Sequence, residues 1–241
     1  MRVEDMTTGS RPYYLRRAVL LYEAENGSAF ASVNPVRRRN KKATIGAGRC
    51  LSRDALAELN RELAGLPSRR ELLPPHVLFA DGSRTLWYRP AHRAPIFFNT
   101  GSKKLDSFFR GKQVLYPPLL FLAMPQNLYA WGLGSDDRPS GETHLYRAPC
   151  LNLYGDGHMC AGTSKLPLEV STDVRLFEKA FFDTAFSHSN LGGQELCRYA
   201  GGHDALWKAL ADPEVTPDWP AWLAPLRGKS GPLTAAEVLN R

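Results

Sequence analysis

Short apolar segments separated by turn residues fill the middle of this 241-residue chain, and they constrain its fold more than any other feature. Asp81-Gly82 separates one pair of such segments, and Pro125-Gln126-Asn127 separates another. Turn residues between two apolar runs are typical of β-hairpins. We therefore expect an antiparallel meander. Its expected strands and extended stretches are residues 77–80, 85–89, 95–99, 119–123, 128–133 and 146–153.

Strand and helix patterns flank this meander on both sides. Asn26-Gly27 is a hairpin turn signal between apolar residues 13–24 and 28–36, and Pro35 is expected to end the second strand. Ser52 is a suitable helix N-cap, because leucines at helical spacing follow it. The expected helices are residues 53–64, 174–185 and 205–211.

This order of elements predicts an α+β fold, in which helices are segregated from an antiparallel sheet. We expect a single domain over residues 1–211, with an N-terminal hairpin at 13–36 and a core at about 52–190. Residues 212–241 are rich in proline and tryptophan and are expected to form a tail that lies extended over the domain, with a disordered end.

The densest run of special residues is 149–167, and it contains the candidate functional cysteine, Cys160. Gly155 and Gly157 predict a tight turn just before the cysteine, because glycine tolerates positive φ. The four residues that follow it, 161–164, are all small. This arrangement indicates an accessible thiol. The alternative is that Cys160 is a small buried hydrophobic residue, as many intracellular cysteines are.

Composition excludes several other classes of protein. No run of 18 apolar residues is present, and the first residues lack the apolar segment of a signal peptide, so we expect a cytoplasmic protein. Its four cysteines are then free thiols. No Cys-x-x-Cys pair occurs, and the nearest ligand set lacks a standard metal spacing, so we expect no metal and no cofactor. That set is His144, Cys150, His158 and Cys160.

The formal net charge is +7, and much of it lies in basic clusters. Such clusters can bind nucleic acid, remain solvated, or dock an acidic protein. We favour the last two interpretations, because no nucleic-acid-binding motif accompanies the clusters. The clusters are 16–17, 37–42, 69–70, 103–104 and 110–112.

The residues around Cys160 are similar to those of ubiquitin-conjugating enzymes. Asn152 lies eight residues before the cysteine, Gly157 three before, and the apolar Met159 just before it. More specifically, the chain resembles prokaryotic E2 family D, the conjugating-enzyme-like proteins of the PRTRC plasmid cassettes. The matching stretches cover about half of the chain and are residues 97–99, 117–121, 145–149, 152–160, 181–182 and 186–190.

This resemblance implies a ubiquitin-conjugating-like fold with an extra N-terminal hairpin. It also implies a transferase that accepts a ubiquitin-like protein as a thioester on Cys160. The implied partners are a ThiF-like activating enzyme, the ubiquitin-like protein and a JAB-type protease. The His-Pro-Asn triplet of eukaryotic enzymes is absent, because Cys150 and Leu151 precede Asn152.

The same resemblance assigns candidate roles to the polar residues nearby. Asn152 would donate to the oxyanion or hold the loop that does, and its alternative is a turn-capping role. His188 and Asn190 lie where a group receiving the amine is expected, although a structural role fits His188 as well. His158 would lower the pKa of the thiol or face solvent.

Two other functions remain open from the sequence. A cysteine hydrolase would use Cys160, His188 and Asn190 and would act without an activating partner. A degenerate conjugating fold would act as a scaffold that docks cassette partners through its basic loops.

Overall fold

The computed structural model describes residues 6–8, 11–13, 15–24, 29–39, 42–52, 55–56, 59, 72–162 and 164–240. The chain forms two compact units, Met1–Arg70 and Glu71–Arg241. This division differs from the expected single domain over 1–211 followed by a tail, because the chain separates near residue 70 and residues 212–241 belong to the second unit.

The first unit contains a sheet in which β3, β5 and β6 pair with β4 (Ala29–Arg39), and a separate antiparallel pair of β1 and β2. β3 pairs with β4 from Arg17 opposite Pro35 to Glu23 opposite Ala29. Pro35 does not end the strand as expected. Its carbonyl accepts from Gly46 N–H at 2.8 Å, and Val36 N–H donates to Arg16 at 2.9 Å, so pairing continues past the proline. The strands are β1 (Met6–Thr8), β2 (Arg11–Tyr13), β3 (Arg17–Glu23), β4 (Ala29–Arg39), β5 (Lys42–Ile45) and β6 (Arg49–Cys50).

Ser52 caps the helix expected at residues 53–64. Its hydroxyl accepts from Ala55 N–H at 3.1 Å, and its carbonyl accepts from Leu56 N–H at 2.9 Å. Ala55, Leu56 and Leu59 are helical, and the remainder of the expected helix lies outside the described residues.

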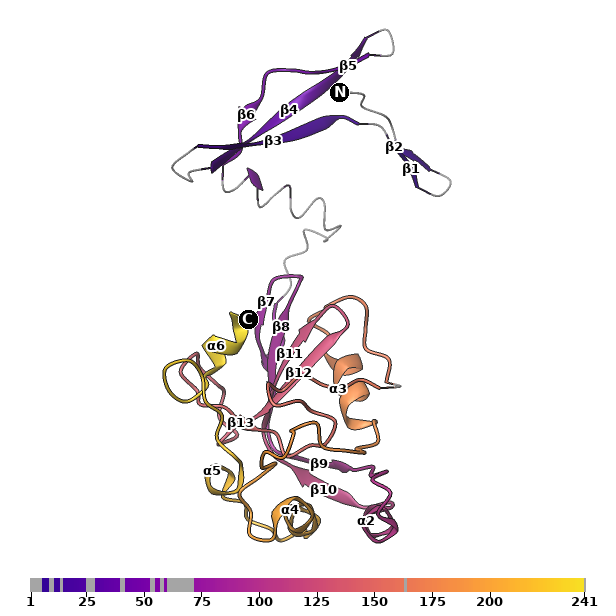
Figure 1. Cartoon of the computed structure of the whole chain (residues 1–241), viewed down its shortest axis with the longest axis vertical. Helices are drawn as coiled ribbons and strands as arrows, with labels where there is room; N and C mark the ends of the chain where they lie inside the picture. The colour runs from indigo at the N-terminus through magenta and orange to yellow at the C-terminus, as the bar shows by residue number, and fades with distance from the viewer. Residues whose placement is uncertain are drawn as a thin grey trace. The chain divides into compact units, whose positions relative to one another are not determined.

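The second unit contains the predicted meander. Its five-stranded sheet has the order β13-β12-β11-β8-β7, and every neighbouring pair is antiparallel (Figure 1). The turn between β11 and β12 holds Gln126 at φ 61°. The strands are β7 (Val77–Ala80), β8 (Thr85–Arg89), β11 (Leu119–Met124), β12 (Asn127–Gly132) and β13 (Tyr146–Arg147).

A second, two-stranded sheet is inserted between β8 and β11. It pairs β9 (His92–Pro95) with β10 (Gln113–Tyr116), and α2 (Lys103–Phe109) connects them. The strand expected at residues 95–99 is therefore wrong: it ends at Pro95, and Phe98 instead forms an isolated bridge with Phe186. The sequence did not predict α2, whose buried residues are Leu105 and Phe109.

The five-stranded sheet has an apolar core on each face. One core contains Trp87 and Phe121 with residues of α3 (Arg175–Phe182) and α4 (Gly202–Leu210). The other contains Leu120 and Leu122 with residues from the C-terminal segment, residues 212–240. Alternate strand residues point to opposite faces, so β11 contributes to both cores. α3 and α6 accordingly lie on opposite sides of the sheet (Figure 1).

The C-terminal segment is part of the fold and not an appended tail. It contains α5 (Trp219–Trp222) and α6 (Ala235–Leu239), and Leu223 and Val238 are fully buried. Arg147 N–H donates to Ala224 O at 2.8 Å, which ties the segment to β13. Leu226, Leu233 and Val238 of this segment pack in the core on the second face of the sheet, so residues 212–240 belong to the fold of the second unit.

The helices expected at residues 174–185 and 205–211 are α3 and α4, each with shifted ends. Among the described residues, no helix is long and apolar enough to cross a membrane.

Candidate active site

The structure brings the sequence-predicted site residues together around a short segment, residues 152–154. Cys160 N–H donates to Asn152 O at 2.7 Å on one side of this segment. Asn152 N–H donates to His188 O at 2.9 Å on the other side. Tyr154 also forms a parallel bridge with Asn190. Backbone hydrogen bonds therefore bring Cys160 and His188, which are far apart in the chain, to opposite sides of Asn152.

The hairpin that carries Cys160 is fastened to the edge of β12. Ala130 N–H donates to Gly157 O at 2.9 Å, and Met159 N–H donates to Leu128 O at 2.8 Å. Gly157 has φ 90°, and a Cβ there would lie 2.4 Å from Trp131 Nε1. The turn therefore requires glycine at 157, as predicted. Gly155 is not in the left-handed region, and a Cβ there would meet nothing closer than 3.7 Å.

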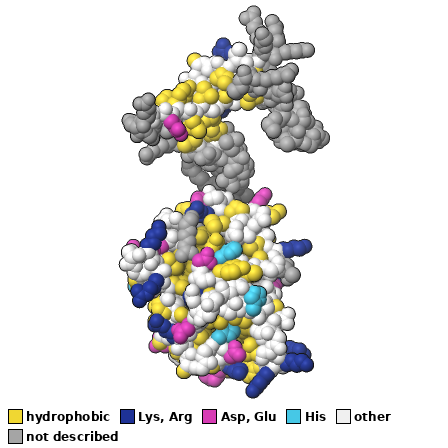
Figure 2. All heavy atoms as spheres, in the orientation of Figure 1, with side chains coloured by type: hydrophobic (Ala, Val, Ile, Leu, Met, Phe, Trp, Pro, Cys, Tyr) yellow, Lys and Arg dark blue, Asp and Glu magenta, His cyan; other side chains and the backbone are white. Residues whose placement is uncertain are grey.

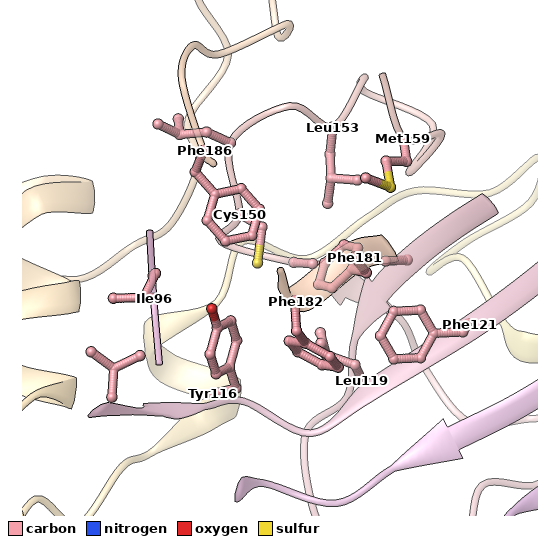
Figure 3. Packing of buried hydrophobic residues seen from close by; sticks show 14 of the residues in the cluster. Ile96, Tyr116, Leu119, Phe121, Cys150, Leu153, Met159, Phe181, Phe182 and Phe186 are labelled. Carbon is pink, nitrogen blue, oxygen red and sulfur yellow. The ribbon is translucent and has the colours of Figure 1, made fainter. Parts of the chain in front are cut away.

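Alternation along the hairpin turns Cys160 away from the core. Leu153 and Met159 form an antiparallel bridge, and both are buried against the α3 side of the sheet (Figure 3). Their neighbours Tyr154 and Cys160 therefore face outward. Cys160 is a partly exposed free thiol. It is accessible, as the turn and the small residues after it indicated.

Asn152 holds two loops together through its side chain. It is 7% exposed and has φ 63°, a conformation that asparagine tolerates better than most residues. Its amide Nδ2 donates to Ala185 O at 2.8 Å, and its Oδ1 accepts from both the N–H and the hydroxyl of Ser187 at 3.0 Å. The geometry therefore favours the loop-holding role over direct donation to an oxyanion.

The Ser187 hydroxyl links Asn152 to His188. It lies 3.0 Å from Asn152 Oδ1 and 2.8 Å from His188 Nδ1. An amide oxygen can only accept, so the hydroxyl donates to Oδ1, and His188 Nδ1–H donates to the hydroxyl. This network assigns the tautomer of neutral His188 with an unprotonated Nε2. His188 is exposed, so that nitrogen can accept a proton from a bound substrate.

Asn190 is half-buried beside Tyr154. Its side-chain Nδ2 is buried and has no hydrogen-bond partner among the described residues. A buried donor without a partner is unusual, because leaving one unpaired costs about 1–3 kcal/mol.

His158 lies in a row of aromatic rings. Its ring is 5.7 Å from that of Tyr154 and 5.0 Å from that of Tyr129, and Tyr129 stacks on Trp131 at 5.7 Å. Its Nε2 lies 3.0 Å from Asn127 Oδ1. His158 therefore supports the ring of Tyr154.

Tyr154 is a site residue that the sequence did not predict. A hydrogen bond with Cys160 is the main cause that raises the pKa of the Tyr154 hydroxyl above its ordinary value, and the charge of the thiolate adds to it. The tyrosine is 42% exposed. The hairpin pattern could have revealed it, since positions 154, 158 and 160 all face outward from one turn.

The other cysteines are not candidates for the same role. Cys150 is buried in the core among aromatic residues (Figure 3), and burial raises the pKa of its thiol far above the ordinary value. Cys197 is buried, and Cys50 is exposed on the first unit. The four residues considered as metal ligands do not cluster: the described residues contain no group of three or more His, Cys, Asp or Glu side chains suited to a metal.

The basic clusters do not form one continuous patch on the face of the second unit that Figure 2 shows. Lys and Arg side chains are dispersed there among acidic and apolar ones. The structure does not describe the side chains of residues 69–70 or of most residues in the cluster 37–42.

A cysteine presented on a tight hairpin by an antiparallel meander, with helices after it, is the arrangement of the ubiquitin-conjugating-like class of proteins. The model of prokaryotic E2 family D matches residues 56–222. This match covers more than half of the chain, and the chain therefore belongs to this family of E2-like proteins. No curated protein and no solved structure matched the chain.

Proposed function

We propose that this protein is an E2-like carrier, which accepts a ubiquitin-like protein as a thioester on Cys160 and passes it to an amine. The observation that carries the proposal is the partly exposed Cys160 thiol, held by Asn152 on a family-matched hairpin. A hydrolase would need a base in contact with the thiol, and His188 is instead bonded to Ser187.

The proposed reaction has two steps. The Cys160 thiolate first attacks the activated C-terminal carbonyl of the ubiquitin-like protein, and the sulfur of the activating enzyme leaves. An amine then attacks the new thioester, and the thiolate of Cys160 leaves. The unprotonated Nε2 of His188 receives the proton that the amine loses. Asn152 keeps the loops of Cys160 and His188 in register through its bonds to Ala185 and Ser187.

The proposed partners follow from the family resemblance: a ThiF-like activating enzyme, a small ubiquitin-like protein and a JAB-type protease encoded in one plasmid cassette. We place the carrier in the cytoplasm, and the four free thiols support a reducing compartment.

A thioester assay tests the proposal. The chain is mixed with the activating enzyme, the ubiquitin-like protein and ATP, and the products are separated on gels with and without thiol. We expect a thiol-labile adduct that is lost in Cys160→Ala and retained in Cys50→Ala.

Absence of an adduct beside an activating enzyme that demonstrably charges itself would contradict the carrier function. Retained binding of that enzyme under the same conditions would instead favour a scaffold.

A further inference from the structure

We infer that the first unit is a docking module, which binds an acidic segment of a partner protein on the face of its sheet that presents Arg17, Leu21 and Arg49. The strands of this unit all precede the residues 56–222 that match the family model. The inference therefore goes beyond the proposed carrier function and does not depend on the chemistry of Cys160.

The first observation is how charge is distributed along the chain. Residues 1–70 contain fourteen Lys and Arg and seven Asp and Glu, whereas residues 71–241 contain seventeen of each kind. The whole formal net charge of +7 therefore lies in the first unit, and the second unit has no net charge. Charge that is segregated in this way favours an acidic partner for the first unit alone.

The second observation is the arrangement of side chains on one face of the sheet. Alternate residues of a strand share a face, and residues directly opposite each other on paired strands lie on the same face. Val19 pairs with Val33 of β4, and Val33 pairs in turn with Arg49 of β6. Arg17 and Leu21 each lie two residues from Val19 on β3, so they belong to this face as well. We refer to it as the Arg17 face.

The Arg17 face combines exposed apolar side chains with cations. Leu21 is 78% exposed and Val19 is 45% exposed. Arg17 and Arg49 are exposed, and within the described part of the chain neither forms an ion pair. The two arginines line a cleft of about 260 Å³, whose other lining residues are Val33, Asn34, Pro35 and Ala47. A carboxylate in this cleft can bind either guanidinium group while a neighbouring apolar side chain packs on Val19 and Leu21.

The chemistry of the Arg17 face favours a protein over a nucleic acid. Single strands of nucleic acid bind in cationic grooves that also contain aromatic side chains, on which the bases stack. The exposed aromatic pair of this sheet, Tyr22 and Phe30, belongs to the opposite face, and its rings stack on each other at 4.5 Å. The cations of the Arg17 face instead lie beside aliphatic side chains, which suit the apolar side chains of a protein.

An NMR titration of the full chain tests this docking surface. The probe is a capped peptide that alternates glutamate and leucine, and the control peptide alternates lysine and leucine. With the glutamate peptide we expect saturable shifts in the backbone signals of Arg17, Val33 and Arg49, with a Kd of about 1 mM or lower. The lysine peptide should cause no saturable shift. The Kd should rise with salt concentration, because both arginines are exposed.

Variants separate the contribution of the charges from that of the apolar side chains. Arg17→Gln combined with Arg49→Gln should raise the Kd of the glutamate peptide at least about tenfold, and Leu21→Ser should raise it about threefold. Arg110→Gln is the matched control, because it removes an exposed cation of the second unit, and its Kd should equal that of wild type. Arg17→Glu combined with Arg49→Glu should reverse the preference, so that the lysine peptide binds. All four positions are exposed, and circular dichroism checks that each variant keeps its fold.

Three outcomes would overturn the inference. One is the lack of any saturable shift with the glutamate peptide at concentrations up to about 10 mM. Another is an unchanged Kd in the double glutamine variant. The third is tighter binding of a single-stranded oligonucleotide than of the glutamate peptide, lost in the same variant, which would assign the Arg17 face to nucleic acid. Each of these outcomes leaves the carrier function intact, because thioester formation on Cys160 is measured separately.

Discussion

The backbone N–H of Cys160 donates to the carbonyl oxygen of Asn152 at 2.7 Å, and this bond positions the thiol beside the loop that carries His188. The side chain of Asn152 holds that loop as well, through Ala185 and Ser187. Asn152 therefore contacts both sides of the site, which gives its side chain a structural role that does not depend on contact with a substrate.

Asn152→Ala should destabilise the second unit. It removes bonds to Ala185 and Ser187 and places alanine at a positive φ. We expect a loss of about 2–4 kcal/mol in the free energy of unfolding. Denaturant titration measures it, with Asn240→Ala as a control: this residue is exposed, its side chain donates to Ala236 O, and we expect a loss of less than about 1 kcal/mol. Equal losses in the two variants would contradict the organising role.

Gly157→Ala should be more costly than Gly162→Ala. Both glycines have positive φ, but a Cβ at 157 would lie 2.4 Å from Trp131 Nε1, whereas one at 162 would meet nothing within 4 Å. The expected losses are about 3 kcal/mol or more at 157 and about 1 kcal/mol at 162. Thermal unfolding of the two variants side by side distinguishes them, and a reversed order would refute the close approach to Trp131.

Leu223→Ala should show that the C-terminal segment is integral to the second unit. Leu223 is fully buried, so we expect a loss of about 2–5 kcal/mol. Leu176 on α3 is 64% exposed, and Leu176→Ala should change stability by less than about 0.5 kcal/mol. If urea unfolding gave the same midpoint for both variants, the packing of this segment would be in doubt.

His92 should make stability fall as the pH is lowered from about 6.5 to 4. Burial first, and then the charge of Arg89, lowers the pKa of His92 to about 4. The unfolded chain binds this proton near pH 6.5 and the folded chain does not, so acid favours unfolding. After a discount for partial exposure, we expect a loss of about 1–2 kcal/mol over this range.

Unfolding free energies measured at several pH values check this prediction. The slope between pH 6.5 and 4 should shrink in His92→Gln and persist in His144→Gln, which alters an exposed histidine. An identical slope in His92→Gln and wild type would show that another group is responsible.

The sequence predicted the elements that are marked by residues close together in the chain, such as an apolar run beside a turn. β11 and β12 are apolar runs on either side of a clear turn, and they pair over six residue positions as expected. α2 was missed because its polar and basic residues outnumber Leu105 and Phe109, and only tertiary burial explains it. The C-terminal segment was interpreted as a tail because proline and tryptophan carry no helix or strand period, although the second face of the sheet requires a cover.

At the site, the sequence predicted positions better than roles. Cys160 and Gly157 followed from the turn and its small neighbours, and the structure places them as expected. The partners of the Asn152 amide could not be predicted, because Ala185 and Ser187 lie more than thirty residues away in the chain. Tyr154 received no role from the sequence, because its stacking on His158 depends on the folding of the hairpin.

The most direct test of the carrier function is the intact mass of the chain after incubation with the activating enzyme, the ubiquitin-like protein and ATP. We predict a gain equal to the mass of the ubiquitin-like protein minus one water, reversed by hydroxylamine and assigned to Cys160 by peptide mapping. In Cys160→Ser the same gain should resist thiol, because an oxygen ester replaces the thioester. An unmodified mass beside a fully charged activating enzyme, or modification at a cysteine other than Cys160, would contradict the account.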